Sequence, residues 1–235
     1  MTVTDTNKRS FSWLNFYNSS LGKKIITGVT GLGLTLFVLF HAIANLVILD
    51  DPNTYNQLGH WLNNLSFLYY GVELTLLAAV IFHGVVGINI RLRARRSRPD
   101  SYDRLESAGK PSKQTISSRS MAITGIVLVG FLIWHLWSFK YGAYYTTMVD
   151  GVVMRDLSRL VIEKFHNPLY AFGYLSLISF LGIHLRHGIW SAWQSLGVLS
   201  GSNSSFVYQL SFILAIAITL GFVTIPLTIY FGLVS

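Results

Sequence analysis

Five long apolar stretches constrain the fold of this chain more than any other feature of its sequence. They comprise residues 25–49, 65–90, 121–139, 169–190 and 206–233, and each is uncharged or nearly so. Each reaches roughly 20 residues, the length that a helix needs to cross about 30 Å of hydrocarbon at about 1.5 Å per residue. The sequence therefore predicts an all-α membrane protein, with five transmembrane helices that form one domain over residues 1–235.

Composition agrees with a membrane protein and limits the metal chemistry. Hydrophobic residues make up 51% of the chain and charged residues only 12%, which does not describe an ordinary soluble domain. The first 24 residues lack a short apolar core followed by a small-residue cleavage site, so we expect no removable signal peptide. Cysteine is absent, which excludes disulfides, iron–sulfur ligation by this chain and cysteine-based zinc sites.

The basic residues stand at the ends of the apolar stretches, which argues against nucleic acid as a partner although the formal net charge is +8. Thirteen of them precede the first stretch or lie between the second and third: Lys8, Arg9, Lys23, Lys24, Arg91, Arg93, Arg95, Arg96, Arg98, Arg104, Lys110, Lys113 and Arg119. The opposite side carries four: Lys140, Arg155, Arg159 and Lys164. The positive-inside rule therefore predicts a cytoplasmic N-terminus, a cytoplasmic loop at 91–120 and an external C-terminus.

Two connecting segments on the external side also carry expectations. The segment "DDPNTYNQLGHWLNN", residues 50–64, is rich in turn formers and is expected to be a loop. The segment "VVMRDLSRLVIEKFHNP", residues 152–168, has apolar residues at helical spacing beside charges. This pattern predicts a short interfacial helix that Pro168 ends.

Four of the apolar stretches each carry a histidine well inside their ends. Ionisable side chains inside a membrane are costly, so a functional role is the default, although a single histidine can simply bond to a neighbouring helix. Counted from the inner ends of their spans, His41 and His135 lie sixteen and fourteen residues up, roughly 21–24 Å at helical rise. His83 and His184 lie seven and six residues up, roughly 9–11 Å. The histidines therefore form an outer pair and an inner pair.

Two level pairs on different helices fit two haems stacked across a bilayer, because each iron then takes one imidazole nitrogen from either side of the ring. Gly28, Gly31 and Gly33 in the first span leave room for a neighbouring helix or for a flat ligand. Zinc or copper would instead gather three or four ligands at one height. Four unrelated polar contacts, or the proton relay of a transporter, are the other interpretations of these histidines.

The chain resembles the dihaem cytochrome b membrane anchor of succinate:quinone oxidoreductases and fumarate reductases, in its single-polypeptide, five-helix form. The resemblance covers nearly the whole chain and is carried by "VLFHAIAN", "VELTLLAAVIFHGVVG", "SRSMAITGIVLVGFLIWHLW" and "HLRHGIWSAWQSLG". It implies that His83 and His184 are axial ligands of a proximal haem b, and that His41 and His135 are ligands of a distal haem b. This assignment agrees with the pairing by height.

The resemblance also implies a function and partners. The chain would be the anchor subunit of succinate dehydrogenase and would carry electrons between an iron–sulfur subunit and a quinone, with menaquinone the quinone expected. An FAD-containing flavoprotein would oxidise succinate to fumarate, and the iron–sulfur subunit would bind the basic cytoplasmic face. Reverse flow would make the complex a fumarate reductase. The expected location is the bacterial cytoplasmic (inner) membrane, and no dicarboxylate site is expected on this chain.

Further candidate residues lie near the expected cofactors. On the inner side, the candidates for contact with haem propionate or quinone are Lys23, Lys24, Thr27, Arg119, Arg186 and His187. For Arg186 a lipid phosphate is an equally good partner. Glu73 is the only carboxylate inside a span and lies roughly 15 Å outward of His83. We interpret Glu73 and His60 as candidates for proton transfer or quinol binding, although a structural hydrogen bond of Glu73 to a neighbouring helix is equally open.

Two other functions remain open at this point. A haem-free proton-coupled transporter would use histidine and glutamate relays, but the sequence lacks the symmetric repeats and broken helices typical of such proteins. A cytochrome b subunit of a hydrogenase or formate dehydrogenase would keep the haems and change the partner. The complex-III type of cytochrome b is disfavoured, because its paired histidines lie on only two helices.

Overall fold

The computed structural model describes residues 12–97 and 116–234, and almost all of this part is helical. Most of the expected cytoplasmic loop at 91–120 lies outside the described residues. Six basic residues, two near the N-terminus and four in this loop, also lie outside the described residues: Lys8, Arg9, Arg98, Arg104, Lys110 and Lys113.

Five helices are long and apolar enough to cross a membrane, which confirms the expected all-α membrane fold. They are α2 (Ser20–Leu46), α4 (Phe67–Arg96), α5 (Ile116–His135), α7 (Pro168–Ser195) and α8 (Ser204–Tyr230). A 3₁₀ turn, η1 (Val47–Leu49), extends α2, and a π-helical turn, η2 (Leu136–Lys140), extends α5. Helix α4 continues past its expected end at residue 90, because its last turn carries arginines that complement the negative end of the helix dipole.

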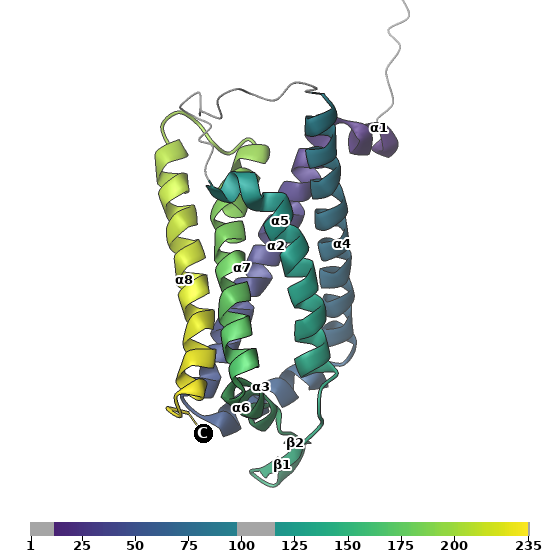
Figure 1. The fold of residues 1–235 in the computed structure, drawn as a ribbon. Coiled ribbons are helices and arrows are strands. Elements are labelled where there is room, and N and C mark those ends of the chain that lie inside the picture. Colours follow the sequence, from purple (N-terminus) through teal and green to yellow (C-terminus); the bar gives the residue numbers. More distant parts are fainter. Residues whose placement is uncertain (1–11, 98–115, 235) are drawn as a thin grey trace, which may run out of the picture.

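The long helices run side by side, and the short elements gather at the two ends of the bundle (Figure 1). One end, which we call the α1 end, carries α1 (Trp13–Asn18) and the start of α2. The other, the α6 end, carries α3 (Pro52–Asn64), α6 (Leu157–His166) and a hairpin of β1 (Thr146–Val149) and β2 (Val152–Arg155). The C-terminus also lies at the α6 end, as an odd number of spans requires.

Both connections at the α6 end differ from their expected structure. Residues 52–64 form helix α3 rather than a loop, since the Asp51 side chain accepts hydrogen bonds from the N–H groups of Asn53 and Thr54, and Pro52 occupies the first turn. The prediction of a helix over all of residues 152–168 is wrong at its start, because residues 152–155 form strand β2. Asp150 and Gly151 both have positive φ and make the two-residue turn that joins the strands.

Helix α7 is central in the bundle and packs against α2, α5, α6 and α8. Small residues allow this packing: a Cβ atom at Gly182 would lie 2.5 Å from Oγ1 of Thr219 on α8, so the two backbones approach as closely as a glycine permits. Helix α4 packs mainly against α2 and exposes many large apolar side chains. An apolar exposed surface of this kind suits contact with lipid rather than water.

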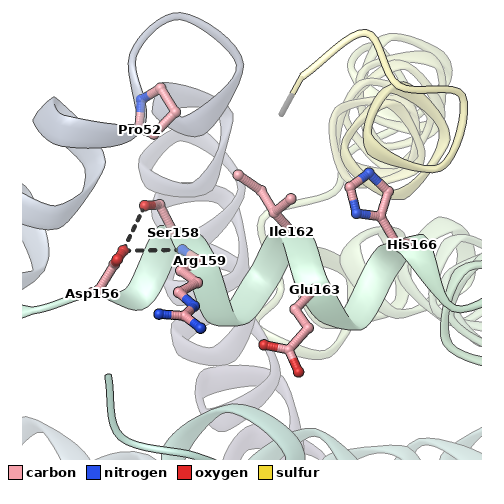
Figure 2. A pocket seen from close by; sticks show the side chains of 7 residues that line it. All are labelled: Pro52, Asp156, Ser158, Arg159, Ile162, Glu163 and His166. Atoms are coloured by element: carbon pink, nitrogen blue, oxygen red, sulfur yellow. Dashed lines mark hydrogen bonds between the residues drawn. The ribbon is translucent and has the colours of Figure 1, made fainter. Parts of the chain in front are cut away.

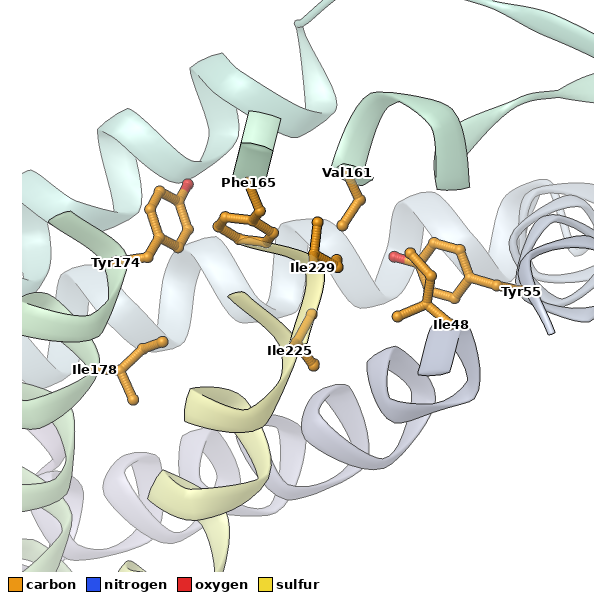
Figure 3. Packing of buried hydrophobic residues seen from close by; sticks show 8 residues of the cluster. All are labelled: Ile48, Tyr55, Val161, Phe165, Tyr174, Ile178, Ile225 and Ile229. Atoms are coloured by element: carbon orange, nitrogen blue, oxygen red, sulfur yellow. The ribbon is translucent and has the colours of Figure 1, made fainter. Parts of the chain in front are cut away.

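A buried apolar cluster closes the α6 end of the bundle (Figure 3). Its members come from η1, α3, α6, α7 and α8, and they are Ile48, Tyr55, Val161, Phe165, Tyr174, Ile178, Ile225 and Ile229. Removal of this surface from water fixes the short helices α3 and α6 against the ends of the long ones. The short helices can therefore present side chains to the interior of the bundle.

Candidate functional site

The fold brings the four intramembrane histidines together as two pairs, each formed across two helices. The rings of His83 on α4 and His184 on α7 have their centroids 6.3 Å apart, with an interplanar angle of 69°. The rings of His41 on α2 and His135 at the end of α5 have their centroids 5.8 Å apart, with an angle of 87°. We call His83 with His184 the inner pair and His41 with His135 the outer pair.

The spacing within each pair suits a single metal ion held between two imidazoles. Two imidazole nitrogens on opposite sides of one metal, each about 2 Å from it, place the ring centroids about 6 Å apart. Within residues 12–97 and 116–234, no group of three or more His, Cys, Asp or Glu residues is placed to hold a metal ion. The donor sets are thus pairs of imidazoles, which are the sets that a haem iron accepts along its axis and that a tetrahedral metal does not.

The inner pair is oriented by oxygen atoms that face Nδ1 of each ring. Nδ1 of His83 lies 3.2 Å from the Thr27 carbonyl oxygen and 3.3 Å from Oγ1 of Thr30, both on α2. Nδ1 of His184 lies 2.9 Å from Oγ1 of Thr124 on α5. These contacts join α4 to α2 and α7 to α5, and so fix the directions of both rings.

The threonine contacts also indicate which ring nitrogen carries the proton. Oγ1 of Thr30 lies 2.7 Å from the Ile26 carbonyl, and Oγ1 of Thr124 lies 3.1 Å from the Ser120 carbonyl. Each hydroxyl donates its proton to that carbonyl, so its oxygen is left to accept from Nδ1–H of the histidine. Nδ1 is then the donor in both inner rings, and Nε2 keeps the lone pair that a metal needs.

The hydrogen bonds of the inner rings and of His41 involve Nδ1 and not Nε2. Within the described part of the chain, Nε2 of these rings makes no hydrogen bond that would compete with a metal.

Two glycines leave space beside the inner pair. A Cβ atom at Gly31 on α2 would lie 3.0 Å from Cε1 of His83, and a Cβ atom at Gly125 on α5 would lie 3.6 Å from Cε1 of His184. By contrast, a Cβ atom at Gly28 would meet the end of α7, and one at Gly33 would meet nothing within 4 Å. Of the three glycines in the first span, Gly31 is the one that admits an imidazole ring.

The outer pair has different surroundings. Nδ1 of His41 lies 3.4 Å from Nδ2 of Asn45, one turn later on α2, whereas Nδ1 of His135 is buried and has no hydrogen-bond partner among the described residues. The His135 ring packs among aromatic rings of α5, η2 and α7, namely Phe131, Phe139 and Tyr174. The π-helical turn η2 begins directly after His135, and such turns are frequent at functional sites.

Four of the inner-side candidates lie near the α1 end. Lys23 is buried with only 3% of its surface exposed, and its Nζ lies 5.7 Å from the centroid of the Tyr17 ring. Lys24 is exposed on the same turn of α2, and Arg119 is exposed in the first turns of α5. The backbone of Thr27 faces His83 directly, which links this region to the inner pair.

Arg186 and His187 point in different directions from α7. The guanidinium of Arg186 contacts α8, where Nη2 donates to the Tyr208 hydroxyl at 3.1 Å and the group lies 5.2 Å from the Phe212 ring. His187 lies beside Trp190, with ring centroids 6.1 Å apart. The structure thus brings Arg186 to the α7–α8 interface and His187 to the turn that follows the inner pair.

The two outer candidates have protein partners. Glu73 on α4 forms an ion pair with Lys140, the last residue of η2. Both side chains are about one-third exposed, at 29% and 33%, and the Tyr69 ring lies 5.9 Å from Nζ of Lys140. His60 on α3 lies 2.9 Å from Nδ2 of Asn64 through its Nε2. The ion pair joins α4 to the end of α5 near the outer pair.

An open pocket lies on the surface of α6, away from the histidine pairs (Figure 2). Its polar side chains include Arg159, Glu163 and His166. Asp156 caps α6 at its edge: burial opposes ionisation of this carboxyl, but hydrogen bonds from the Arg159 N–H, Asn56 and Ser158 outweigh burial and lower its pKa. This pocket belongs to the capping structure of the α6 end.

Several residues of the site were not expected from the sequence. Asn45 follows His41 by four positions, which is a signal for a contact on one helix face. Thr30, Thr124 and Lys140 carry no such signal, because the partner of each lies on a different helix.

Comparisons with known proteins agree with the architecture. A family model described as the succinate dehydrogenase/fumarate reductase transmembrane subunit matches residues 95–224, a range that includes His135 and His184. The succinate dehydrogenase cytochrome b558 subunit of Bacillus subtilis (strain 168) is 25% identical over 175 residues, which cover 74% of this chain and 77% of that protein. No solved structure matches the chain significantly.

Proposed function

Because the chain belongs to the succinate dehydrogenase/fumarate reductase transmembrane subunit family, we propose that it is the cytochrome b anchor of a succinate:quinone oxidoreductase with two bis-histidine haems b. The observation that carries this proposal is the presence of two imidazole pairs at metal-spanning distance, 6.3 Å and 5.8 Å between ring centroids. The haems supply one-electron transfer between the iron–sulfur subunit and a quinone.

The four histidines hold the two cofactors. His83 and His184 would hold the haem nearer the α1 end, and His41 and His135 would hold the haem nearer the α6 end. The hydrogen bonds from Nδ1 of the inner rings to threonine oxygens support this role, because they leave Nε2 as the ligand atom. At Gly31 and Gly125 the absence of a side chain lets the inner rings lie against the backbones of α2 and α5.

Charged groups at the α1 end bind acidic groups of the cofactor, the quinone or the partner. Lys23, Lys24 and Arg119, with Thr27, are candidates for contact with haem propionate or quinone. The charge of Lys23 is buried, and a buried cation favours an anionic partner. Arg186 and His187 extend this basic region along α7. We assign the α1 end to the cytoplasm, where the iron–sulfur subunit docks, because basic residues concentrate there.

At the α6 end, Glu73 and His60 are the candidates for proton transfer or quinol binding. The ion pair of Glu73 with Lys140 supports a functional interpretation, since a carboxylate within a membrane span is rare and is a candidate functional group by default. The Tyr69 ring beside this pair adds a flat aromatic surface of the kind that a quinone ring can stack on.

Membership of the family supports the remaining parts of the proposed complex. An FAD-containing flavoprotein oxidises succinate to fumarate, or catalyses the reverse reaction, and an iron–sulfur protein connects it to this chain. The quinone is menaquinone, and the complex lies in the bacterial cytoplasmic membrane. This chain supplies cofactor binding and attachment rather than dicarboxylate chemistry.

A visible spectrum tests the proposal. Reduced-minus-oxidised spectra of the detergent-purified protein, with a pyridine haemochrome count, should give two haems b per chain. His41→Ala and His184→Ala should each lose one haem, and the two variants should lose different ones. His166→Ala is the matched control, because this histidine is exposed on α6 outside both pairs, and it should keep both haems. A colourless protein would overturn the proposal.

A further inference from the structure

The two pairs differ in what faces Nδ1 of their rings. Nδ1 of both inner histidines faces oxygen atoms that accept a hydrogen bond, as described above. In the outer pair, His135 meets no partner within the described residues, and His41 meets the nitrogen of the Asn45 amide. An amide nitrogen donates and does not accept, so Nδ1 of His41 accepts this hydrogen bond in the structure. When Nδ1 carries the proton, as a ligand bound through Nε2 requires, Nδ1–H has no acceptor there.

The Asn45 amide is held in this orientation from two sides. Its Nδ2 donates to the His41 carbonyl at 2.7 Å, and its Oδ1 accepts from the Tyr55 hydroxyl at 2.8 Å. Tyr55 is 7% exposed, and burial raises the pKa of its phenol, so the hydroxyl keeps its proton and remains a donor. The Asn45 oxygen is therefore bonded to Tyr55 rather than to His41.

Helix α3 holds Tyr55 firmly in place. The neighbouring residue Asn56 is buried and ties α3 to α6: its Oδ1 accepts from the Ser158 N–H at 2.8 Å, and its Nδ2 donates to Oδ1 of Asp156 at 2.9 Å. Tyr55 itself belongs to the apolar cluster at the α6 end. The Tyr55 hydroxyl that bonds to Asn45 is thus held in place by an anchored helix rather than by a loop.

We propose that Tyr55 is a positioning residue for the outer pair, which acts by holding the Asn45 oxygen away from Nδ1 of His41. This inference rests on the proposed function, since it takes His41 as a haem ligand. An acceptor on Nδ1–H makes an imidazole a stronger electron donor to its metal, and second-shell hydrogen bonding is one of the ways a protein sets a haem potential. Tyr55 therefore keeps the His41 imidazole a weaker donor than the inner imidazoles.

Removal of the hydroxyl tests this role. In Tyr55→Phe the part-buried Asn45 oxygen loses its donor, so the amide is held only by the bond from Nδ2 to the His41 carbonyl. An unpaired acceptor is costly, and a turned amide, which exchanges that bond for one from Nδ1–H of His41 to the Asn45 oxygen, becomes favoured. Potentiometric titration of the detergent-solubilised haem protein, followed by visible and EPR spectra, should then show one haem shifted to a more negative midpoint potential. The other haem should keep its potential, and both haems should remain bound.

Three further variants make the result specific. Tyr230→Phe removes another tyrosine hydroxyl at the α6 end, from a ring that packs against Phe172 and Phe231 and not against a histidine of either pair, and should leave both potentials unchanged. Asn45→Asp offers an acceptor oxygen in either orientation and should shift the same haem in the same direction as Tyr55→Phe. Asn45→Leu offers none, so Tyr55→Phe added to it should cause no further shift.

The proposal is overturned if Tyr55→Phe leaves both potentials unchanged in a folded protein with two haems. It is also overturned if Tyr230→Phe produces the same shift, or if the shift persists in the Asn45→Leu background. Failure of the proposed function is distinguishable from these outcomes, because His41→Ala would then retain both haems, whatever the effect of Tyr55→Phe.

Discussion

Oγ1 of Thr124 lies 2.9 Å from Nδ1 of His184, and this contact joins the middle of α5 to the inner half of α7. The threonine hydroxyl proton is directed to a carbonyl of its own helix, so its oxygen accepts from the imidazole. A proposed ligand histidine is thereby oriented from a helix other than its own. The same arrangement recurs between Thr30 and His83, with the helices α2 and α4 in place of α5 and α7.

Replacement of Thr124 by valine keeps the volume of the side chain and removes the acceptor. Loss of a hydrogen bond behind a metal-bound histidine typically weakens metal affinity about 10–100-fold. We expect Thr124→Val to lower the occupancy of the inner haem and to leave the outer haem bound, as measured by a haemochrome count after dilution in detergent. Thr224→Val is the control, since this exposed threonine of α8 bonds only to its own helix; an equal loss there would contradict the assignment.

The space at Gly31 is a second requirement of the inner pair. Gly31→Val places a branched side chain where even a Cβ atom would lie 3.0 Å from the His83 ring, and such overpacking costs about 1–3 kcal/mol. We expect loss of one haem from the spectrum. Gly33→Val, on the opposite and exposed face of the same helix, should keep both haems, because a Cβ atom there meets nothing within 4 Å. Retention of two haems in Gly31→Val would show that the His83 ring has room to move.

The sequence predicts the number of spans and the pairing of the histidines, since both follow from hydropathy and the rise of a helix. The partners behind the rings do not follow, because they depend on how each helix is rotated about its axis. Helices α4 and α5 are apolar on all sides, so no polar face in the sequence marks that rotation. The contacts of Thr124 and of Lys140 therefore emerge only from the packed bundle.

The short elements at the α6 end are a different case, because their signals are present in the sequence. Asp51 and Pro52 are a strong start signal for the helix that follows, and Asp150 and Gly151 between valines are a strong hairpin signal. The expectation of a loop gave too much weight to the turn-forming residues of this segment. Tyr55, on that unexpected helix, was missed for the same reason.

The contact between Gly182 and Thr219 predicts a compensating pair of substitutions. Gly182→Ala should destabilise the α7–α8 interface by about 1–3 kcal/mol, because the new Cβ atom would lie 2.5 Å from Oγ1 of Thr219. Thr219→Ala removes that oxygen and should restore most of the loss in the double variant. Thermal unfolding in detergent measures both effects. Gly188→Ala, whose nearest neighbour would be 4.0 Å away, should be close to neutral, and a double variant no better than the single one would refute steric contact as the cause.

The cap of α6 should make the stability of the α6 end depend on acid pH. Hydrogen bonds lower the pKa of Asp156 below its ordinary value of 3.8, so its stabilising contribution is present above that value and is lost as pH falls through the folded-state pKa. Asp156→Ala should cost about 1 kcal/mol at neutral pH, because the cap is removed. Asp156→Asn retains a capping oxygen but not the charge, so its unfolding temperature should fall less steeply than that of the wild type below about pH 4. Asp50→Asn, at an exposed carboxylate outside this network, should follow the wild-type curve, and an equal flattening there would assign the effect to net charge instead.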